Sequence, residues 1–303
     1  MMNKLLMVAL TVTLLSGCQS DDGSAGTDNA VVGGKPIVVA ATVGGTRSFA
    51  TDDRLWVWAD KTATDDFIKA WALDYNGTSF RPTTSYYWPE NVTGLTFKAV
   101  YGNFPTNAIM QSATTWTGLE LTHTVESNQT SAASRQKSDL LYKQTAATKG
   151  EVVDLKLEHQ LSMVSVVLEK VEGSGISDDV LRNATVRLSG AVRTTTFKCS
   201  DLSTTPSGSA ETIEMGGSDN KREAIIPCQE ATLTLEVTLN NFPASSMSRT
   251  FTCTLPTTSF HKGQNYQYTL TLNNNVSATL SSISQLSDET VGIVIPPATV
   301  AGD

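Results

Sequence analysis

Residues 232–239, TLTLEVTL, alternate between polar and apolar side chains. In a β-strand, successive side chains point to opposite faces, so the leucines and the valine of this segment would share one face. The same period of two recurs in residues 162–168, 250–255 and 266–272. Alternation with a single apolar face is typical of strands that cover a core on one side only.

Helical patterns are scarce by comparison. Short helical turns are expected near Ser138 and Ser177, where a serine can cap the first backbone N–H groups of a helix. The Asn76-Gly77 pair between two apolar runs predicts a tight hairpin. Many short strands with few helices predict an all-β protein made of β-sandwiches.

The chain is expected to divide near its middle. A polar stretch over residues 127–138 precedes a new apolar alternation that begins at Val152. We therefore predict one β-sandwich over residues 34–148 and a second over residues 149–303, joined near Gly150. Both segments have an ordinary domain size, which allows each to bury a core of its own.

The first 18 residues, MMNKLLMVALTVTLLSGC, predict a secretory signal. Lys4 supplies the positive start, and the apolar run from Leu5 to Leu15 is too short to span a bilayer. The small residues before Cys18 are similar to those of a bacterial lipoprotein signal, which would be cut before Cys18 and acylated there. An ordinary signal peptide with an unrelated cysteine is the alternative. Residues 19–33 are rich in small and acidic residues and are expected to form a flexible tether.

Composition and motifs argue against several functions. The 303-residue chain has a formal net charge of −8, which does not suit nucleic-acid binding. No serine lies in a Gly-x-Ser-x-Gly sequence, and no glycine-rich phosphate loop opens a helix. His123, His159 and His261 lack the spacing of metal ligands. We expect no enzymatic activity, cofactor or metal, and we expect His159 to hydrogen-bond to backbone near the domain junction rather than act as a base.

Three cysteines remain after the predicted processing, and the sequence leaves their pairing open. Cys253 shares a predicted strand face with apolar residues and is expected to be buried. Cys199 and Cys228 flank a polar loop over residues 204–220. An oxidising envelope would allow a disulfide between these two, which would stabilise the fold by roughly 3–4 kcal/mol.

All five tryptophans lie in the first 116 residues. Trp56 and Trp58 would share one strand face, where aromatic rings either fill a core or form a platform on which sugars stack. Core packing is favoured, because tryptophan side chains bury large areas.

Seven stretches of the chain, in order, resemble the fimbrillin family, the subunits of the lipoprotein-derived pili of Bacteroides-type bacteria. They are residues 37–43, 55–58, 86–89, 95–101, 139–142, 153–162 and 260–268. The resemblance implies two transthyretin-like β-sandwiches in series. It also implies a structural or tip subunit of a surface pilus that serves adhesion and is exported to the outer membrane as a lipoprotein. Its partners would be other pilin subunits, an arginine-specific protease, outer-membrane lipid, and a host glycan or protein.

The resemblance further implies assembly by strand exchange. In the family, a protease cuts behind the first strand, and a terminal strand of a neighbour replaces that strand. Residues 37–43 would be the leaving strand. The cut would fall between Arg47 and Ser48, in a polar, glycine-rich segment, with Arg54 as the alternative site. A plain surface arginine at a strand end is the other interpretation of Arg47.

Residues 290–297, TVGIVIPP, are the candidate donor strand. Val291, Ile293 and Ile295 alternate as a donor requires, and the prolines that follow cannot donate to a ladder. The alternative is that this segment is the last strand of the chain's own second domain.

Two other functions stay open at the level of sequence. One is a monomeric surface lipoprotein that binds glycan through its aromatic first domain. The other is a membrane-anchored pilus base subunit, which would keep its lipid and escape cleavage. Strand exchange distinguishes a polymerising pilus subunit from both of these functions, because it needs an accessible arginine and a free C-terminal strand.

The lipid can be tested directly. We predict that Cys18→Ala abolishes acylation and surface display, whereas the matched change Cys199→Ala leaves both intact. Labelling of cells with a fatty-acid probe, followed by surface immunodetection, measures both properties. Unchanged labelling of the Cys18→Ala protein would show that Cys18 is not the acylated residue.

Overall fold

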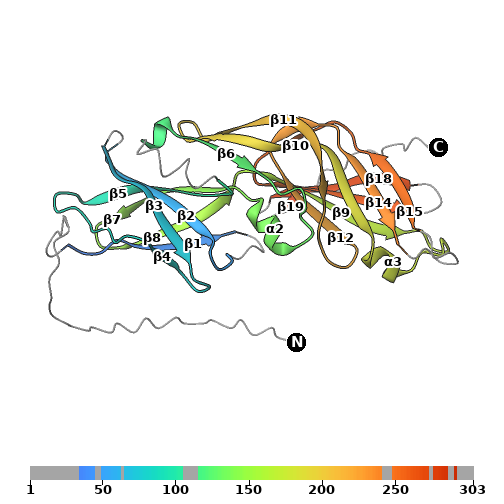
Figure 1. Ribbon diagram of the computed structural model, residues 1–303, viewed down its shortest axis with the longest axis horizontal. Helices are drawn as coiled ribbons and strands as arrows, with labels where there is room; N and C mark the ends of the chain where they lie inside the picture. The colour runs from blue at the N-terminus through green and yellow to red at the C-terminus, as the bar shows by residue number, and fades with distance from the viewer. Residues whose placement is uncertain are drawn as a thin grey trace. The chain divides into compact units, whose positions relative to one another are not determined.

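The computed structural model describes residues 34–44, 49–62, 65–104, 115–240, 248–272, 276–285 and 290–291. The protein is all-β, as predicted, with about 60% strand and 7% helix. The helices described are the short α2 (Ala132–Lys137) and α3 (Asp178–Arg182), together with the single 3₁₀ turn η1 (Trp116–Gly118). Figure 1 shows how the strands fill the rest of the fold.

The first half of the chain forms a seven-stranded sheet in the order β1-β8-β7-β5-β2-β3-β4. Its strands are β1 (Val38–Val43), β2 (Arg54–Thr62), β3 (Asp65–Tyr75), β4 (Phe80–Pro82), β5 (Gly94–Tyr101), β7 (Leu141–Thr148) and β8 (Val152–His159). Within this sheet, β1 and β8 are parallel and the other neighbours are antiparallel. The Asn76-Gly77 hairpin is present between β3 and β4, and Gly77 has the positive φ that its turn requires.

This sheet rolls around its own core, so we call it the rolled sheet. Its two end strands, β1 and β4, contact each other. The backbone just before β1 also pairs with the segment that follows β4, because Ile37 N–H donates to Tyr86 O at 2.8 Å and Trp88 N–H donates to Lys35 O at 2.9 Å. Apolar side chains from every strand meet inside.

The five tryptophans are core residues, with exposed fractions between 0% and 4%. Trp71 and Trp88 lie in the core of the rolled sheet, and Trp71 Nε1 donates to Thr84 O at 2.7 Å. Trp56, Trp58 and Trp116 belong to the second core. The prediction of core packing is confirmed, and the alternative of a sugar platform on Trp56 and Trp58 is wrong, because neither ring has an exposed face.

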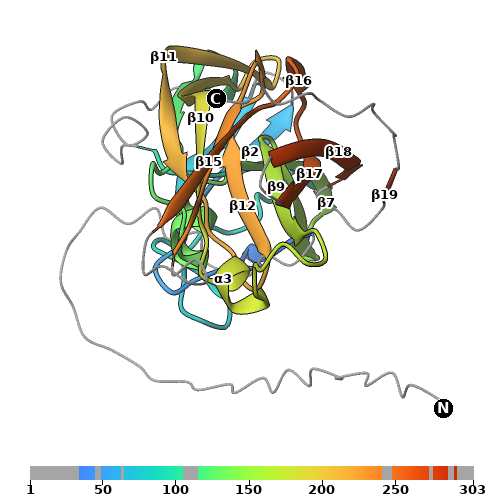
Figure 2. The same cartoon turned by 90° about the vertical axis from the view of Figure 1, so that its right-hand side faces the viewer.

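The second half is a sandwich of two larger sheets and one small one. One sheet has the order β11-β10-β14-β15, with β6 also paired to β10; the other has the order β12-β9-β17-β18-β19. The strands are β6 (Glu120–Thr124), β9 (Ser162–Lys170), β10 (Thr185–Lys198), β11 (Ser203–Glu214), β12 (Lys221–Ile226), β13 (Gln229–Ala231), β14 (Thr234–Leu239), β15 (Arg249–Thr254), β16 (Thr258–Phe260), β17 (Gln264–Leu272), β18 (Val276–Gln285) and β19 (Thr290–Val291). Figure 2 shows the two layers end-on.

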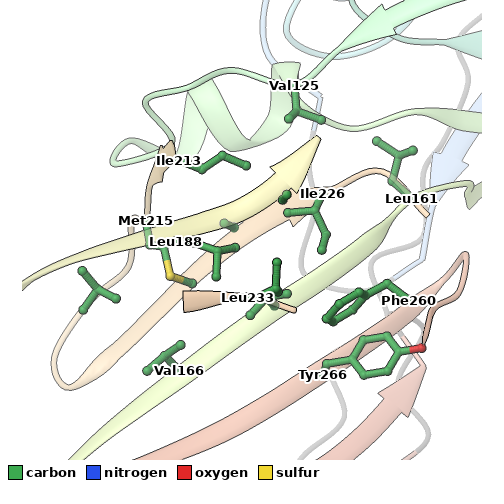
Figure 3. Packing of buried hydrophobic residues seen from close by; sticks show 14 of the residues in the cluster. Val125, Leu161, Val166, Leu188, Ile213, Met215, Ile226, Leu233, Phe260 and Tyr266 are labelled. Atoms are coloured by element: carbon green, nitrogen blue, oxygen red, sulfur yellow. The ribbon is translucent and has the colours of Figure 1, made fainter. Parts of the chain in front are cut away.

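The core of this sandwich follows from the alternation in the sequence. The TLTLEVTL segment forms β14, and its apolar residues from Leu233 to Leu239 are all fully buried. In Figure 3, Leu233 and Leu188 point into the same core, and Phe260 lies against Tyr266. The ring centroids of the last two residues are 4.8 Å apart in an edge-on arrangement, which suits aromatic rings.

The sheets do not divide at residue 148. β8 lies in the rolled sheet, and β6, far ahead of the predicted boundary, lies in the second half. The reason is that Gly150, with φ +86°, forms the turn of the β7–β8 hairpin instead of a linker. The chain enters the second half first at β6, returns to the rolled sheet with β7, and passes into the sandwich again between His159 and Ser162.

β10 gives β6 its place in the second half. β10 pairs with β14 over Thr185–Ser189 and with β6 over Thr194–Lys198, so the two ends of β10 have different neighbours. Gly190 lies between them with φ +96°, and a Cβ there would lie 2.5 Å from Thr232 O. Only glycine fits this bend without moving backbone.

One of the two predicted helical turns is placed differently. Ser138 ends α2 as its C-cap instead of starting a helix, and Ser131 is the N-cap, accepting from Ser134 N–H at 3.0 Å. Ser138 is fully buried, and its hydroxyl accepts from Glu126 N–H. Ser177 caps α3 as predicted.

A chain of aromatic rings joins the two halves. Trp58 of β2 and Trp116 have ring centroids 5.1 Å apart, Trp116 stacks on Tyr142 of β7 at 5.5 Å, and Tyr142 lies 5.9 Å from Phe197 of β10. All four rings belong to one buried cluster. The two halves therefore share apolar contacts in addition to the connecting chain.

We predict that Trp116→Ala lowers the free energy of unfolding by about 3–5 kcal/mol, because it leaves a large cavity between the two halves. The exposed neighbour Thr117 gives the matched control, since Thr117→Ala should have little effect. Denaturant unfolding measures both variants. A loss below about 1 kcal/mol for Trp116→Ala would contradict the structural role of this ring.

Candidate functional site

Three of the residues predicted to be functional lie outside the described residues. They are Cys18, the predicted lipid site, and Arg47 and Ser48, the predicted cleavage site. The described part of the chain contains the strand that precedes this cleavage site and the surface around it. The candidate site is therefore the edge of the rolled sheet that carries β1.

β1 is an edge strand with one side chain in two directed at the core. Val39, Ala41 and Val43 are half-buried and pack on the core of the rolled sheet, whereas Val38 is 51% exposed. The backbone of β1 pairs with β8 alone, from Val38 opposite Val152 to Val43 opposite Leu157. β1 thus closes the core on one side.

A histidine holds the C-terminal end of β1. His159, the last residue of β8, places its Nε2 3.3 Å from Gly44 O, directly after β1. Its Nδ1 lies 2.9 Å from Oδ2 of Asp139, whose side chain is only 3% exposed. His159 therefore makes the predicted backbone contact, and Asp139 positions its ring.

Both ring nitrogens of His159 face oxygen atoms that accept hydrogen bonds. A carboxylate and a carbonyl cannot donate, so a neutral imidazole can satisfy one of these contacts and the doubly protonated ring satisfies both. A charged donor between Asp139 and Gly44 gives stronger hydrogen bonds than a neutral one. The contact ties the end of β1 to a buried carboxylate.

A hollow of about 510 Å³ opens beside this contact. It is lined by Gly44, Lys143, Lys156, Leu157, Glu158, His159, Gln160, Lys262, Gly263 and Gln264. Three lysines and one glutamate give it a net positive lining, although the chain as a whole is acidic. We call it the basic hollow.

The charges of the basic hollow are only partly paired. Lys143 forms an ion pair with Glu158, and Lys156 Nζ lies 3.7 Å from Asp154 Oδ2, where both side chains are largely exposed. Lys262 has no ion-pair partner among the residues that the structure describes. In the same wall, Oε1 of the buried Gln160 has no hydrogen-bond partner. That oxygen is an acceptor and offers nothing to an anion, so it is the lysines alone that suit this surface to an anionic group.

Arg54, the alternative cleavage site, is held in place. It begins β2, where its Nε lies 2.6 Å from Asp74 Oδ1 and its Nη2 lies 3.0 Å from Oδ2. This bidentate hydrogen bond raises the pKa of Arg54. Its guanidinium also lies 5.4 Å from the ring centroid of Trp56. A protease would have to open a paired strand to reach this bond.

The C-terminal segment is described only in part. β18 runs antiparallel to β17 from Val276 to Gln285, and β19 contributes two residues, Thr290 and Val291, paired to β18. Residues 292–303, which contain most of the candidate donor, lie outside the described residues. Neither interpretation of this segment is decided by its described part.

The three cysteines in the described part of the chain, Cys199, Cys228 and Cys253, are free thiols in the structure. Cys199 and Cys228, the pair for which a disulfide is predicted, are not joined in the structure. Burial raises the pKa of Cys199 to about 12, whereas Cys228 Sγ lies 3.3 Å from Gln160 O. Cys253 is buried, as predicted.

Two buried polar clusters were not predicted by the sequence. Asp60 and Asp66 face each other across β2 and β3, and burial and Asp60 raise the pKa of Asp66, while Lys98 pairs with Asp60. His123 accepts from Asn103 N–H at 3.0 Å and lies 2.9 Å from Ser138 O, and burial lowers its pKa. Both clusters link neighbouring elements inside the fold.

Two kinds of feature are absent from the described residues. No group of three or more His, Cys, Asp or Glu side chains among them is arranged to hold a metal ion. Among the same residues, no helix has the length and apolar character needed to cross a membrane.

Comparison with known proteins assigns the chain to a family. The chain belongs to the Fimbrillin-like family, whose sequence profile matches residues 40–285. No curated protein matches it significantly.

Several solved structures share the fold. One is a protein assigned to cell adhesion from Bacteroides uniformis, 17% identical, with a TM-score of 0.64 over 85% of this chain and 100% of that one. Another protein assigned to cell adhesion, from Bacteroides ovatus, is 17% identical with a TM-score of 0.61 over 83% and 98%. A fimbrial protein from Bacteroides vulgatus is 11% identical with a TM-score of 0.50 over 83% and 99%. At such low identities, the structural similarity shows a common fold and nothing further.

We predict that His159→Gln loosens β1. Loss of one charge-assisted contact should cost about 1.5–3 kcal/mol of local stability and raise amide exchange in residues 38–43 by at least about tenfold. Hydrogen exchange read by mass spectrometry measures this segment. The matched control is His261→Gln, an exposed histidine. Equal β1 exchange in the wild type and His159→Gln would contradict the role given to His159.

Proposed function

We propose that this protein is a non-catalytic structural or tip subunit of a surface pilus that serves adhesion, and that it assembles by exchange of β1. Membership of the Fimbrillin-like family supports a pilus or adhesin role at the cell surface. The observation that carries the proposal is the position of β1. It is an edge strand that covers the core with alternate side chains and ends just before Arg47.

Cleavage after Arg47 is the proposed trigger. Arg47 follows the end of β1 by four residues, so a cut there separates β1 from the rest of the rolled sheet without breaking another described strand. The alternative, Arg54, is less suitable because its strand pairing and its contact with Asp74 protect the bond. The same cut would release the subunit from the acylated Cys18 and its outer-membrane lipid.

The empty groove would be a template for another strand. Departure of β1 exposes the unpaired backbone edge of β8 and the apolar surface under Val39, Ala41 and Val43. Residues 290–297 of a second subunit have the matching alternation of apolar side chains. Backbone hydrogen bonds would supply affinity, and the alternate side chains would supply specificity.

The rival functions have less support. A glycan site on the tryptophans is unsupported, because all five are buried. No described feature favours a membrane-anchored base subunit over a polymerising one. An arginine-specific protease, outer-membrane lipid and host ligands are proposed partners on the strength of the family alone.

We predict that an arginine-specific protease converts the full-length protein to a form that starts at Ser48 and then builds a ladder of oligomers stable in mild detergent. The ladder is expected because a whole strand of hydrogen bonds and buried side chains must be lost together. Arg47→Lys should block both steps, whereas Arg54→Lys should block neither. N-terminal sequencing and gel electrophoresis measure these outcomes.

A truncated protein controls for the donor. Deletion of residues 290–303 should leave cleavage and folding intact and stop ladder growth. Growth equal to that of the wild type would show that the C-terminal segment is not the donor. A cleaved wild-type protein that stays monomeric at high concentration would contradict strand exchange altogether.

A further inference from the structure

The basic hollow lies at one end of the groove that β1 occupies. Gly44, the residue after β1, is part of its lining, and Lys156 of β8 pairs in register with Thr42 of β1. Any strand that replaces β1 must therefore pass this hollow at one of its two ends. The positive charge of the hollow can therefore favour one of the two directions, parallel or antiparallel to β8, in which the replacement strand lies.

We propose that the basic hollow binds the acidic pair Asp288-Glu289 of a second copy of this chain, so that the donor strand lies antiparallel to β8. This inference rests on the proposed strand exchange and adds its direction and its recognition site. β1 itself is parallel to β8, so the exchanged strand reverses the direction of the strand it replaces.

The lengths allow both directions. The core-facing positions of β1 are Val39, Ala41 and Val43, and the apolar positions of the donor, 291, 293 and 295, have the same spacing. Since one edge of β8 can pair with either a parallel or an antiparallel strand, backbone hydrogen bonds alone do not select the direction. The residues that flank the donor differ, and they decide between the two.

In the antiparallel direction, Val291 takes the place of Val43 and Thr290 takes that of Gly44. Glu289 and Asp288 then follow at the next two positions, beside the basic hollow. This arrangement sets two carboxylates against a lining in which Lys262 has no ion-pair partner among the described residues.

In the parallel direction, Ile295 takes the place of Val43, and Pro296 takes that of Gly44. Pro297 follows, and the next acidic residue is Asp303, six residues further on. No donor charge then faces the lysines. Charge complementarity therefore favours the antiparallel direction.

The expected effect is chiefly on the rate of assembly. Exposed ion pairs add little affinity each, but complementary charges speed encounter and fix register. The effect should weaken at high ionic strength, because salt screens exposed charges.

Charge reversal tests the proposal in the full-length protein after cleavage at Arg47. The triple variant Lys143→Glu, Lys156→Glu, Lys262→Glu should form ladders about tenfold more slowly than the wild type at low salt. Adding Asp288→Lys and Glu289→Lys to the same chain should restore most of the rate. The matched control reverses Lys170, Lys198 and Lys221, whose side chains are partly exposed and ion-paired in the second half of the fold, and should leave the rate unchanged.

The outcomes separate this inference from the proposed function. If the wild type forms no ladder, strand exchange itself fails. If the wild type forms ladders and the hollow variant matches its rate, or if the compensating change does not restore it, the antiparallel docking is wrong. Should the triple variant unfold by circular dichroism, Lys262→Glu alone serves in its place, with a several-fold slowing expected. If the triple lysine variant assembles at the wild-type rate but its cleaved monomer no longer binds heparin, the hollow is a site for an acidic glycan. That result would overturn the proposal.

Discussion

The rolled sheet depends on one pairing, that of β1 with β8. Every other described neighbour in this sheet is antiparallel, and the parallel β1 closes the side on which the sheet would otherwise end. Its half-buried side chains cover the core, and the backbone before it pairs with residues 86–88. Without a strand there, β8 would present unpaired N–H and C=O groups beside an open apolar core. The fold therefore requires a strand at this position but does not require that strand to be β1.

The strength of this pairing is intermediate. Interior strands such as β2 and β14 bury their core residues fully, whereas the core-facing residues of β1 remain partly exposed. The contact of His159 with Gly44 adds a clamp at one end, supported by the buried Asp139. A strand held in this way can protect the core in the monomer and still be exchanged once its covalent link is cut. The basic hollow lies at the end of the groove where Gly44 follows β1, so it is placed to contact one end of any replacement strand.

Local pattern predicted much of this architecture. The buried face of β14 and the presence of the first strand follow from the alternation of polar and apolar residues along the sequence. The burial of the tryptophans follows from the large size of their side chains. Both signals can be recognised within a few residues. The placement of β6 and β8 could not be predicted in this way. For β6 it depends on long-range pairing with β10, and for β8 it depends on Gly150 forming a hairpin turn with β7. The clamp escaped prediction for a similar reason, since His159 and Gly44 lie 115 residues apart in the chain. The basic hollow is assembled from four separate segments, so no single stretch of sequence carries its signal.

The most direct test of the account is a cryo-electron-microscopy structure of the assembled polymer, at a resolution that traces the strand beside β8. The account predicts that this strand belongs to a neighbouring subunit and comes from its C-terminal segment, with the neighbour's alternate apolar side chains in the places of Val39, Ala41 and Val43. A polymer in which each subunit keeps its own residues 38–43 beside β8 would contradict the claim that β1 is exchanged.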